Sequence, residues 1–331
     1  MNSYNGIMVY VEFGENGLLP ITRQLLGCGR KIADELGEPL SAVIVGSKGI
    51  EEGSDAAQLG ADTVYIVEHE LLRQYRTETY VAALEQLVRQ QRPTALLMGQ
   101  TYVGRDLAPS LAFRLETIAV LDCIALEIDH ASRVLLLTKP VCGGNAVATF
   151  TSMYYPQIIT IRDKAMLPME PSFGKNAHVV HFAVSLEPRS FKTRLIKKVK
   201  EEGEGLRLEE AAVIISGGRG IGGAEGFRQL HETAAILHAA VGGSRPACDN
   251  RGVAPNRQIG ITGKIVSPDL YIAVGISGSI QQMSGCGQAK RIVAINKDPD
   301  APIFKYADFG VVGDWKKVFP SFSAKLKELV S

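Results

Sequence analysis

The sequence lacks the features that mark an exported, membrane-spanning or nucleic-acid-binding protein. Its 36 basic and 35 acidic side chains nearly cancel, so no net field favours a nucleic acid or an anionic membrane. Its apolar runs, such as 95–98 and 134–137, fall far short of the ~20 residues that a membrane helix needs. The N-terminus has no basic segment, and its first apolar run at 7–11 is too short for a signal peptide. We therefore expect a soluble, cytoplasmic protein with no integral membrane segment and no nucleic-acid partner.

Cysteine is scarce, and the five cysteines lie far apart without a Cys-x-x-Cys pair. This spacing provides neither a zinc motif nor an iron–sulfur motif. His231 and His238 are neighbours on a predicted helix, but the sequence offers them no third ligand. We therefore expect no metal site, and free thiols that pack as small apolar side chains in a reducing compartment.

The composition is that of a packed globular protein with more than one core. Hydrophobic residues make up 46% of the chain and charged residues 21%. A length of 331 residues exceeds the roughly 100 to 200 residues of an ordinary domain, so two domains are expected. Apolar runs alternate with longer amphipathic stretches, which is typical of βα units. The predicted fold class is α/β, with two domains that each hold a largely parallel sheet and flanking helices.

The first domain is predicted to span residues 1–188. Its expected strands are 6–13, 40–45, 63–67 and 95–98, and its clearest helices are 18–36 and 79–91. From residue 121 the pattern changes to short runs at 123–128, 133–138, 146–151, 157–161 and 178–184. No long helix separates these runs, which predicts that the sheet gains antiparallel strands there.

A charged segment at 189–210 separates this domain from the second, predicted over 211–331. The segment is rich in lysine and glutamate and poor in core residues, as expected of a linker. The second domain has expected strands at 212–216, 270–274, 291–295 and 309–312, and expected helices at 225–240 and 315–329.

A glycine-rich turn at 218–223 satisfies the Gly-x-Gly-x-x-Gly pattern of dinucleotide-binding domains. That fingerprint also expects an acidic residue about twenty positions later, at the end of a second strand. Here the region 239–245 is predicted to be the end of a helix and a loop, and it contains no acid. A nicotinamide site is therefore weakly supported, whereas Arg219 on the turn suits a phosphate or the edge of a flavin.

Four further blocks in the second domain resemble ligand-binding turns: 243–249, 258–264, 274–282 and 293–303. Each is a strand-like run followed by small residues that leave backbone N–H groups available, as a bound pyrophosphate requires. The residues Ser277 to Ile280 follow a buried strand and begin a helix, so they are the predicted pyrophosphate site. Ordinary helix capping by Ser277 or Ser279 is an alternative that can coexist with this role.

In their order and spacing these five blocks resemble the FAD-binding domain of the electron transfer flavoprotein α-subunit family. Weaker motifs at 104–109 and 139–148 extend the resemblance over nearly the whole chain. The resemblance implies a flavoprotein that binds FAD and forms a heterodimer with an electron transfer flavoprotein β subunit, which the first domain faces. It implies electron transport between dehydrogenases, with an acyl-CoA dehydrogenase as the partner, and an acceptor. In some members the β subunit binds a second FAD for NADH-dependent electron bifurcation, whereas in others it holds AMP.

The resemblance also implies roles for individual residues. Ser244 and Arg245 match residues at the flavin ring, Thr262 matches a hydroxyl near flavin N5, and Asn296, Asp314 and Trp315 match residues at the adenosine half. The complete set of predicted cofactor-binding residues is Arg219, Ser244, Arg245, Gln258, Ile259, Gly260, Ile261, Thr262, Ser277, Gly278, Ser279, Ile280, Gln281, Gln282, Asn296, Asp314 and Trp315.

Two positions depart from the family pattern. The family usually has glutamine where this chain has Ile261, and it commonly has histidine, placed against the flavin C2 carbonyl, where this chain has Gln282. No catalytic residue is predicted, because in such a protein the flavin carries out the redox chemistry and the protein supplies position and charge. Two alternatives stay open from the sequence: a nicotinamide-dependent dehydrogenase, and a non-redox nucleotide-binding module.

Overall fold

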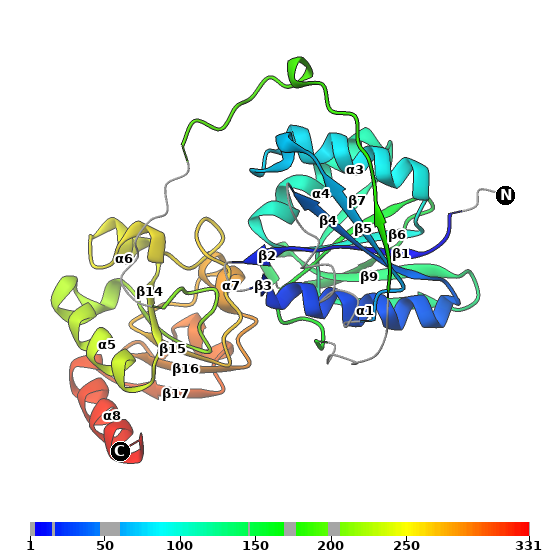
Figure 1. Ribbon diagram of the computed structural model, residues 1–331. Helices are drawn as coiled ribbons and strands as arrows, with labels where there is room; N and C mark the ends of the chain where they lie inside the picture. Colours follow the sequence, from blue (N-terminus) through cyan, green and yellow to red (C-terminus); the bar gives the residue numbers. More distant parts are fainter. Residues whose placement is uncertain are drawn as a thin grey trace. The chain divides into compact units, whose positions relative to one another are not determined.

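Buried strands alternate with amphipathic helices along the chain. The structure is a computed structural model that describes residues 4–14, 17–46, 60–144, 146–168, 177–197 and 206–330. It divides into two compact units, Met1–Val141 with Val147–Lys198, and Cys142–Ala146 with Val199–Ser331 (Figure 1). The division after Lys198 falls inside the charged segment predicted as a linker. No helix in the described ranges is both long and apolar enough to cross a lipid bilayer.

Unit 1 is built on a seven-stranded sheet with the strand order β12-β5-β4-β1-β6-β11-β7. Every recorded pairing in this sheet is parallel. Its strands are β1 (Ile7–Tyr10), β4 (Leu40–Gly46), β5 (Thr63–Glu68), β6 (Ala95–Gly99), β7 (Ala119–Cys123), β11 (Gln157–Ile161) and β12 (His178–His181). Helix α1 (Pro20–Leu36) covers one face, and α3 (Thr77–Gln91) and α4 (Tyr102–Arg114) cover the other (Figure 1).

The sequence of α1 explains its limits and its packing. Pro20 stands at the first helical position, where its missing N–H leaves no hydrogen bond unmade. Gly37 ends the helix in the left-handed conformation, at φ 68°. Between them Leu25 and Ile32 lie on one stripe of the helix and are buried against the sheet.

The antiparallel strands predicted after residue 121 form only in part. Strands β8 (Ala125–Asp129) and β9 (Val134–Val141) pair antiparallel as predicted. They lie with β10 (Ala146–Phe150) in a separate three-stranded sheet, however, and do not extend the main sheet. The prediction is wrong for β11 and β12, which pair parallel within the main sheet. All five residues of β11 are buried, whereas β8 alternates between buried and more exposed residues. Continuous burial is typical of a strand covered on both faces by helices, and alternation is typical of a half-exposed sheet.

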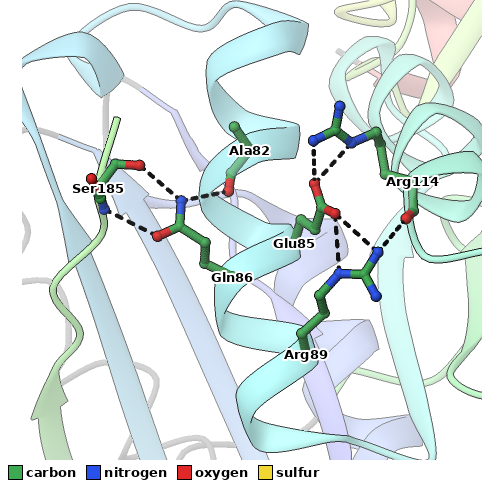
Figure 2. Close-up of polar contacts among 6 residues, drawn as sticks. All are labelled: Ala82, Glu85, Gln86, Arg89, Arg114 and Ser185. Atoms are coloured by element: carbon green, nitrogen blue, oxygen red, sulfur yellow. Dashed lines mark hydrogen bonds and ion pairs between the residues drawn. The ribbon is translucent and has the colours of Figure 1, made fainter. Parts of the chain in front are cut away.

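The last described segment of unit 1 lies along α3. Gln86 donates through Nε2 to the carbonyl oxygens of Ala82 and Ser185, at 3.1 and 3.0 Å, and accepts from the Ser185 N–H at 3.0 Å (Figure 2). Beside it the Glu85 carboxylate bridges Arg89 of the same helix and Arg114 at the end of α4 (Figure 2). These contacts hold both α4 and the segment around Ser185 against α3.

Unit 2 contains a five-stranded parallel sheet with the order β14-β13-β15-β16-β17. The strands are β13 (Val213–Gly217), β14 (Ala240–Gly243), β15 (Leu270–Val274), β16 (Arg291–Asn296) and β17 (Phe309–Val312). Helices α5 (Ala224–Ile236) and α8 (Trp315–Val330) pack on one face (Figure 1). The short helix α7 (Ile280–Cys286) packs on the other face through Met283 and Cys286.

The region 239–245, predicted as the end of a helix and a loop, contains a strand instead. Helix α5 ends at Ile236, β14 follows at Ala240–Gly243, and α6 occupies Arg245–Asp249. Two glycines among four residues give β14 a weak intrinsic preference for extended structure. Its pairing with β13 and its complete burial decide the conformation, and neither can be read from the local sequence.

Candidate functional site

The candidate site is a cavity of about 560 Å³ in unit 2, lined by the turns that follow β13, β14, β15 and β16. In the strand order the second strand, β14, lies on one side of β13, and the third, β15, lies on the other. The crossover connections therefore change direction at β13, and ligands of open parallel sheets bind beside such a point. The volume is in the range of ordinary small-molecule sites, roughly 300 to 1,000 Å³.

The structure brings thirteen of the seventeen predicted cofactor-binding residues into the lining of this cavity. They are Arg219, Ser244, Arg245, Gln258, Ile259, Gly260, Ile261, Thr262, Ser277, Ser279, Gln281, Gln282 and Asn296. Gly278 and Ile280 are not in the lining, although both neighbour residues that are, and Asp314 and Trp315 are also absent from it.

The loop between β15 and α7 offers unpaired hydrogen-bond donors at the cavity. Within the described ranges, the backbone N–H groups of Ser277, Gly278 and Ser279 donate no hydrogen bond. Ser279 is the N-cap residue of α7, yet its side chain makes no capping bond, so its hydroxyl is available too. Gly278 is required for this path: its φ is +79°, and an added Cβ would lie 2.4 Å from the Ile303 backbone. Such a set of N–H and O–H donors suits an anionic ligand.

The glycine-rich turn after β13 packs directly against the end of β15. Gly218 donates to the Val274 carbonyl at 2.9 Å, and a Cβ at Gly218 would lie 2.0 Å from the Gly275 oxygen. Arg219, between the two glycines of the turn, is exposed and lines the cavity. No carboxylate follows β14, because Ser244 and Arg245 come next, so the ribose-binding acid of a nicotinamide site has no counterpart there.

Ser244 and Arg245 have side chains available for a ligand. Ser244 is buried and begins α6, but its side chain makes no capping bond. The Arg245 Nε atom is 3.9 Å from the nearest Asp249 oxygen, and both side chains are 68% exposed. An ion pair that long and exposed contributes little. The guanidinium group can therefore leave Asp249 for a negatively charged ligand at small cost.

The turn at 258–264 orients Thr262. Gln258 donates from Nε2 to the Thr262 hydroxyl oxygen at 2.9 Å, so the Thr262 O–H is left to donate to a ligand. The turn itself is fixed by a bond of 2.7 Å from the Lys264 N–H to the Gln258 carbonyl. Ile261, where the family usually has glutamine, places a 59% exposed apolar side chain at the cavity.

Three predicted residues at the adenosine half have other contacts in the structure. Asn296 uses both ends of its amide within the protein, donating to the Ile276 carbonyl at 2.8 Å and accepting from the Asp298 N–H at 3.0 Å. Asp314 is exposed and accepts from the Lys316 N–H at the start of α8. Trp315 is buried, and its Nε1 donates to the Gly220 carbonyl at 3.0 Å, which supports the glycine-rich turn. Direct contact of these residues with adenosine stays a prediction.

Several cavity-lining residues were not predicted from the sequence. They are Gly218, Gly220, Pro246, Gly275, Ile276, Asp298, Ala301 and Pro302. Asp298 had a usable signal, because it is an acid two positions after a parallel strand, where ligands bind. Ala301 and Pro302 had none, since only the tertiary fold brings that turn to the cavity.

The chemistry of the lining is that of an anion site without a proton-transfer pair. Its charged members are Arg219, Arg245 and Asp298, so positive charge predominates. Among the residues that the structure describes, no group of three or more His, Cys, Asp or Glu side chains is placed to hold a metal ion. The arrangement can bind and orient a negatively charged, nucleotide-like ligand and direct hydroxyl donors at it.

Comparisons with known proteins agree with this chemistry. The family model "Electron transfer flavoprotein domain" matches residues 7–187, and the model "Electron transfer flavoprotein FAD-binding domain" matches residues 207–287. The chain is 41% identical over 330 residues to the electron transfer flavoprotein subunit alpha of Thermoanaerobacterium thermosaccharolyticum, an alignment that covers 99% of this chain and 100% of that protein. It is 38% identical over 329 residues to Protein FixB of Clostridium saccharobutylicum, covering 99% and 98%. It is 36% identical over 323 residues to the electron transfer flavoprotein subunit alpha of Bacillus subtilis, covering 98% of each.

Proposed function

Because this chain belongs to the electron transfer flavoprotein α-subunit family, and so binds FAD and acts with a β subunit in electron transfer, we propose that the cavity in unit 2 is its FAD site. We propose further that the protein carries electrons from acyl-CoA dehydrogenases to an acceptor. Family membership removes the support for a nicotinamide-dependent dehydrogenase and for a non-redox nucleotide-binding module.

The observation that carries the site assignment is the set of unpaired donors in the loop after β15. FAD has a pyrophosphate at its centre, and this loop presents three N–H groups beside the Ser277 and Ser279 hydroxyls. Helix α7 has only seven residues, so these donors matter more than its dipole. The residues present fit the cofactor, since cations and donors outnumber the single acid of the lining.

The proposed role of each residue combines its place at the cavity with the resemblance to the family. The bound flavin supplies the one-electron and two-electron chemistry. In this proposal the loop Ser277–Ser279 would hold the pyrophosphate, and Thr262, which the family resemblance puts near flavin N5, would donate its hydroxyl proton to the ring. Arg219 and Arg245 place positive charge at the cavity, which favours a flavin that has gained negative charge. No side chain needs to take a proton from a substrate.

A double substitution tests the pyrophosphate assignment. Ser277→Ala with Ser279→Ala should weaken FAD binding ~100-fold, from about 1.5 kcal/mol for each hydrogen bond to a charged group. The matched control is Ser284→Ala on the same helix, because Ser284 bonds to the Ile280 carbonyl and lies outside the cavity lining. Equilibrium titration of the α–β complex with FAD, followed by visible absorption, gives the affinities. Equal affinity of the double variant and the control would contradict the assignment.

The partner-facing unit, the linker, the cellular location and the type of electron transfer are also proposals. We propose that the first unit faces the β subunit and that residues 189–210 form the linker between the units. We propose a cytoplasmic location, since buried thiols such as Cys123 and Cys286 fit a reducing compartment. Bifurcation and simple electron transport are separated by one measurement on the α–β complex. A bifurcating complex holds two FAD and is reduced by NADH, whereas a simple carrier holds one FAD and is reduced by an acyl-CoA dehydrogenase with its substrate.

A further inference from the structure

A small buried polar cluster lies beneath the cavity of unit 2. Tyr271 of β15 is 0% exposed, and Gln282 of α7 is 5% exposed and also lines the cavity. The Gln282 Nε2 atom donates to the Tyr271 hydroxyl oxygen at 3.0 Å. Ser216 of β13, the strand next to β15, is 0% exposed as well.

The hydrogen bonds of this cluster follow a single direction. A tyrosine hydroxyl carries one proton, so once it accepts from Gln282 it must donate to another atom. Among its buried neighbours, Ser216 acts on that hydroxyl as a donor and Cys286 acts on it as an acceptor. The Cys286 Sγ atom in turn donates to the Gln282 backbone carbonyl oxygen at 3.4 Å. The chain of donors therefore runs from Gln282 through Tyr271 to Cys286.

The amide oxygen of Gln282 is the end that remains for a ligand. Nε2 is committed to Tyr271, and Oε1 has no hydrogen-bond partner in the part of the chain that the structure describes. Because an amide has its donor on one side and its acceptor on the other, fixing Nε2 inward leaves the acceptor for the cavity.

We propose that Tyr271 is a positioning residue that turns the Gln282 amide so that its oxygen, and not its N–H group, faces the cofactor. This inference rests on the proposed FAD site. The pyrimidine edge of a flavin carries an N–H donor between two carbonyl acceptors. An acceptor at position 282 pairs with the N–H, whereas a donor would pair with a carbonyl and stabilise negative charge on the reduced ring. By holding an acceptor at position 282, Tyr271 keeps the flavin reduction potential lower than it would be with a donor at that position.

The test replaces Tyr271 with phenylalanine, which removes the hydroxyl and keeps the ring. Without its inward partner the amide can turn its N–H group to the cavity. In the α–β complex, Tyr271→Phe should raise the flavin reduction potential, so that reduced FAD binds several-fold more tightly relative to oxidised FAD. This shift should vanish in a Gln282→Leu background, which has no amide to turn. Tyr80→Phe is the control for loss of a buried hydroxyl, since Tyr80 belongs to the core of unit 1.

A second readout needs no cofactor. In the FAD-free complex labelled with ¹⁵N-glutamine, one side-chain amide resonance should be protected from solvent exchange. This resonance should be absent from Gln282→Leu. In Tyr271→Phe it should be present but should lose its protection. If Tyr271→Phe does not fold, the protected resonance of the parent complex and its absence from Gln282→Leu still test the orientation. A lower potential in Tyr271→Phe, or a Gln282 amide unprotected in the parent complex, would mean that the amide has the opposite orientation and would overturn the proposal. Failure of the FAD site itself would show separately, in the Ser277 and Ser279 variants.

Discussion

Glu12 is a buried carboxyl group whose surroundings disfavour its charge. It follows β1 at the carboxyl edge of the unit 1 sheet and is only 8% exposed. Its two carboxylate oxygens both lie 2.9 Å from the Thr101 hydroxyl, which has one proton to share between them. Within the described ranges no cation pairs with it, and its only side-chain partner is Thr101. Burial raises the pKa of Glu12 from 4.5 to about 7, and the bond from Thr101 offsets this only in part.

Glu12 therefore makes the stability of unit 1 depend on pH. Below pH 4.5 the carboxyl is protonated in both folded and unfolded chains, so it carries no penalty. Between pH 4.5 and 7 only the unfolded chain releases the proton, so the free energy of unfolding falls as the pH rises, by at most about 3 kcal/mol. Glu12→Gln should remove this slope and make unit 1 more stable than the parent at pH 8. Urea unfolding at several pH values measures it.

The matched control for Glu12→Gln is Glu127→Gln, which changes an exposed glutamate of β8. That variant should keep the pH slope of the parent chain. A slope that survives in Glu12→Gln would show that Glu12 is not its source and would contradict the prediction.

At the scale of elements, the site depends on one short loop between β15 and α7. Its backbone passes so close to Ile303 that only glycine fits at position 278. The same loop is held by the Asn296 side chain through the Ile276 carbonyl and by the Ile303 N–H through the Ser277 carbonyl. The end of β16 and the turn after it thus support the loop after β15 through its carbonyl groups, and the N–H donors of the loop stay available for the cofactor.

Gly278→Ala should therefore weaken FAD binding by at least ~10-fold, because the loop must move to relieve contact with the Ile303 backbone. The left-handed conformation alone costs an alanine roughly 1 to 2 kcal/mol. Gly222→Ala separates the two effects: Gly222 also has a positive φ, 86°, but nothing lies within 4 Å of its added Cβ. Both variants should lose thermal stability, and only Gly278→Ala should lose FAD affinity by titration. Equal affinities would place the pyrophosphate elsewhere.

At the scale of the whole molecule, each unit exposes apolar side chains that a partner would cover. In unit 1, Met153 is 78% exposed and Tyr154 is 63% exposed. In unit 2, Phe309 and Val312 of the edge strand β17 are 68% and 57% exposed. Exposed apolar groups and open sheet edges mark interaction surfaces or aggregation hazards. Because this chain belongs to a family whose α subunit acts with a β subunit, we predict that such surfaces contact that subunit.

Expression of this chain without its β subunit should therefore yield aggregates or a protein with weak FAD retention. Co-expression with the β subunit should yield a monodisperse heterodimer that is yellow from bound flavin. Size-exclusion chromatography with light scattering and a visible spectrum compares the two preparations. A monodisperse monomer that retains a full complement of FAD would refute this prediction.

Three strands of the second unit and the chemical nature of the site follow from the amino-acid sequence alone. Short apolar runs that end in glycine and serine predict β13, β15 and β16 within one or two residues, because burial and turn chemistry are local properties. The blocks that contain these residues resemble a known family, and that resemblance identifies thirteen members of the cavity lining. The departures at Ile261 and Gln282 are likewise properties of the chain's own residues.

Tertiary contacts decide which strands lie side by side and what each polar side chain touches. The parallel pairing of β11 and the existence of β14 depend on neighbours far away in the chain, so no local pattern reveals them. Trp315 supports a turn 95 residues away, and Tyr271 turns the amide of Gln282 from the adjacent layer. Hydrogen bonds act over about 3 Å and only with the correct geometry, so their partners exist only once the sheet has placed them.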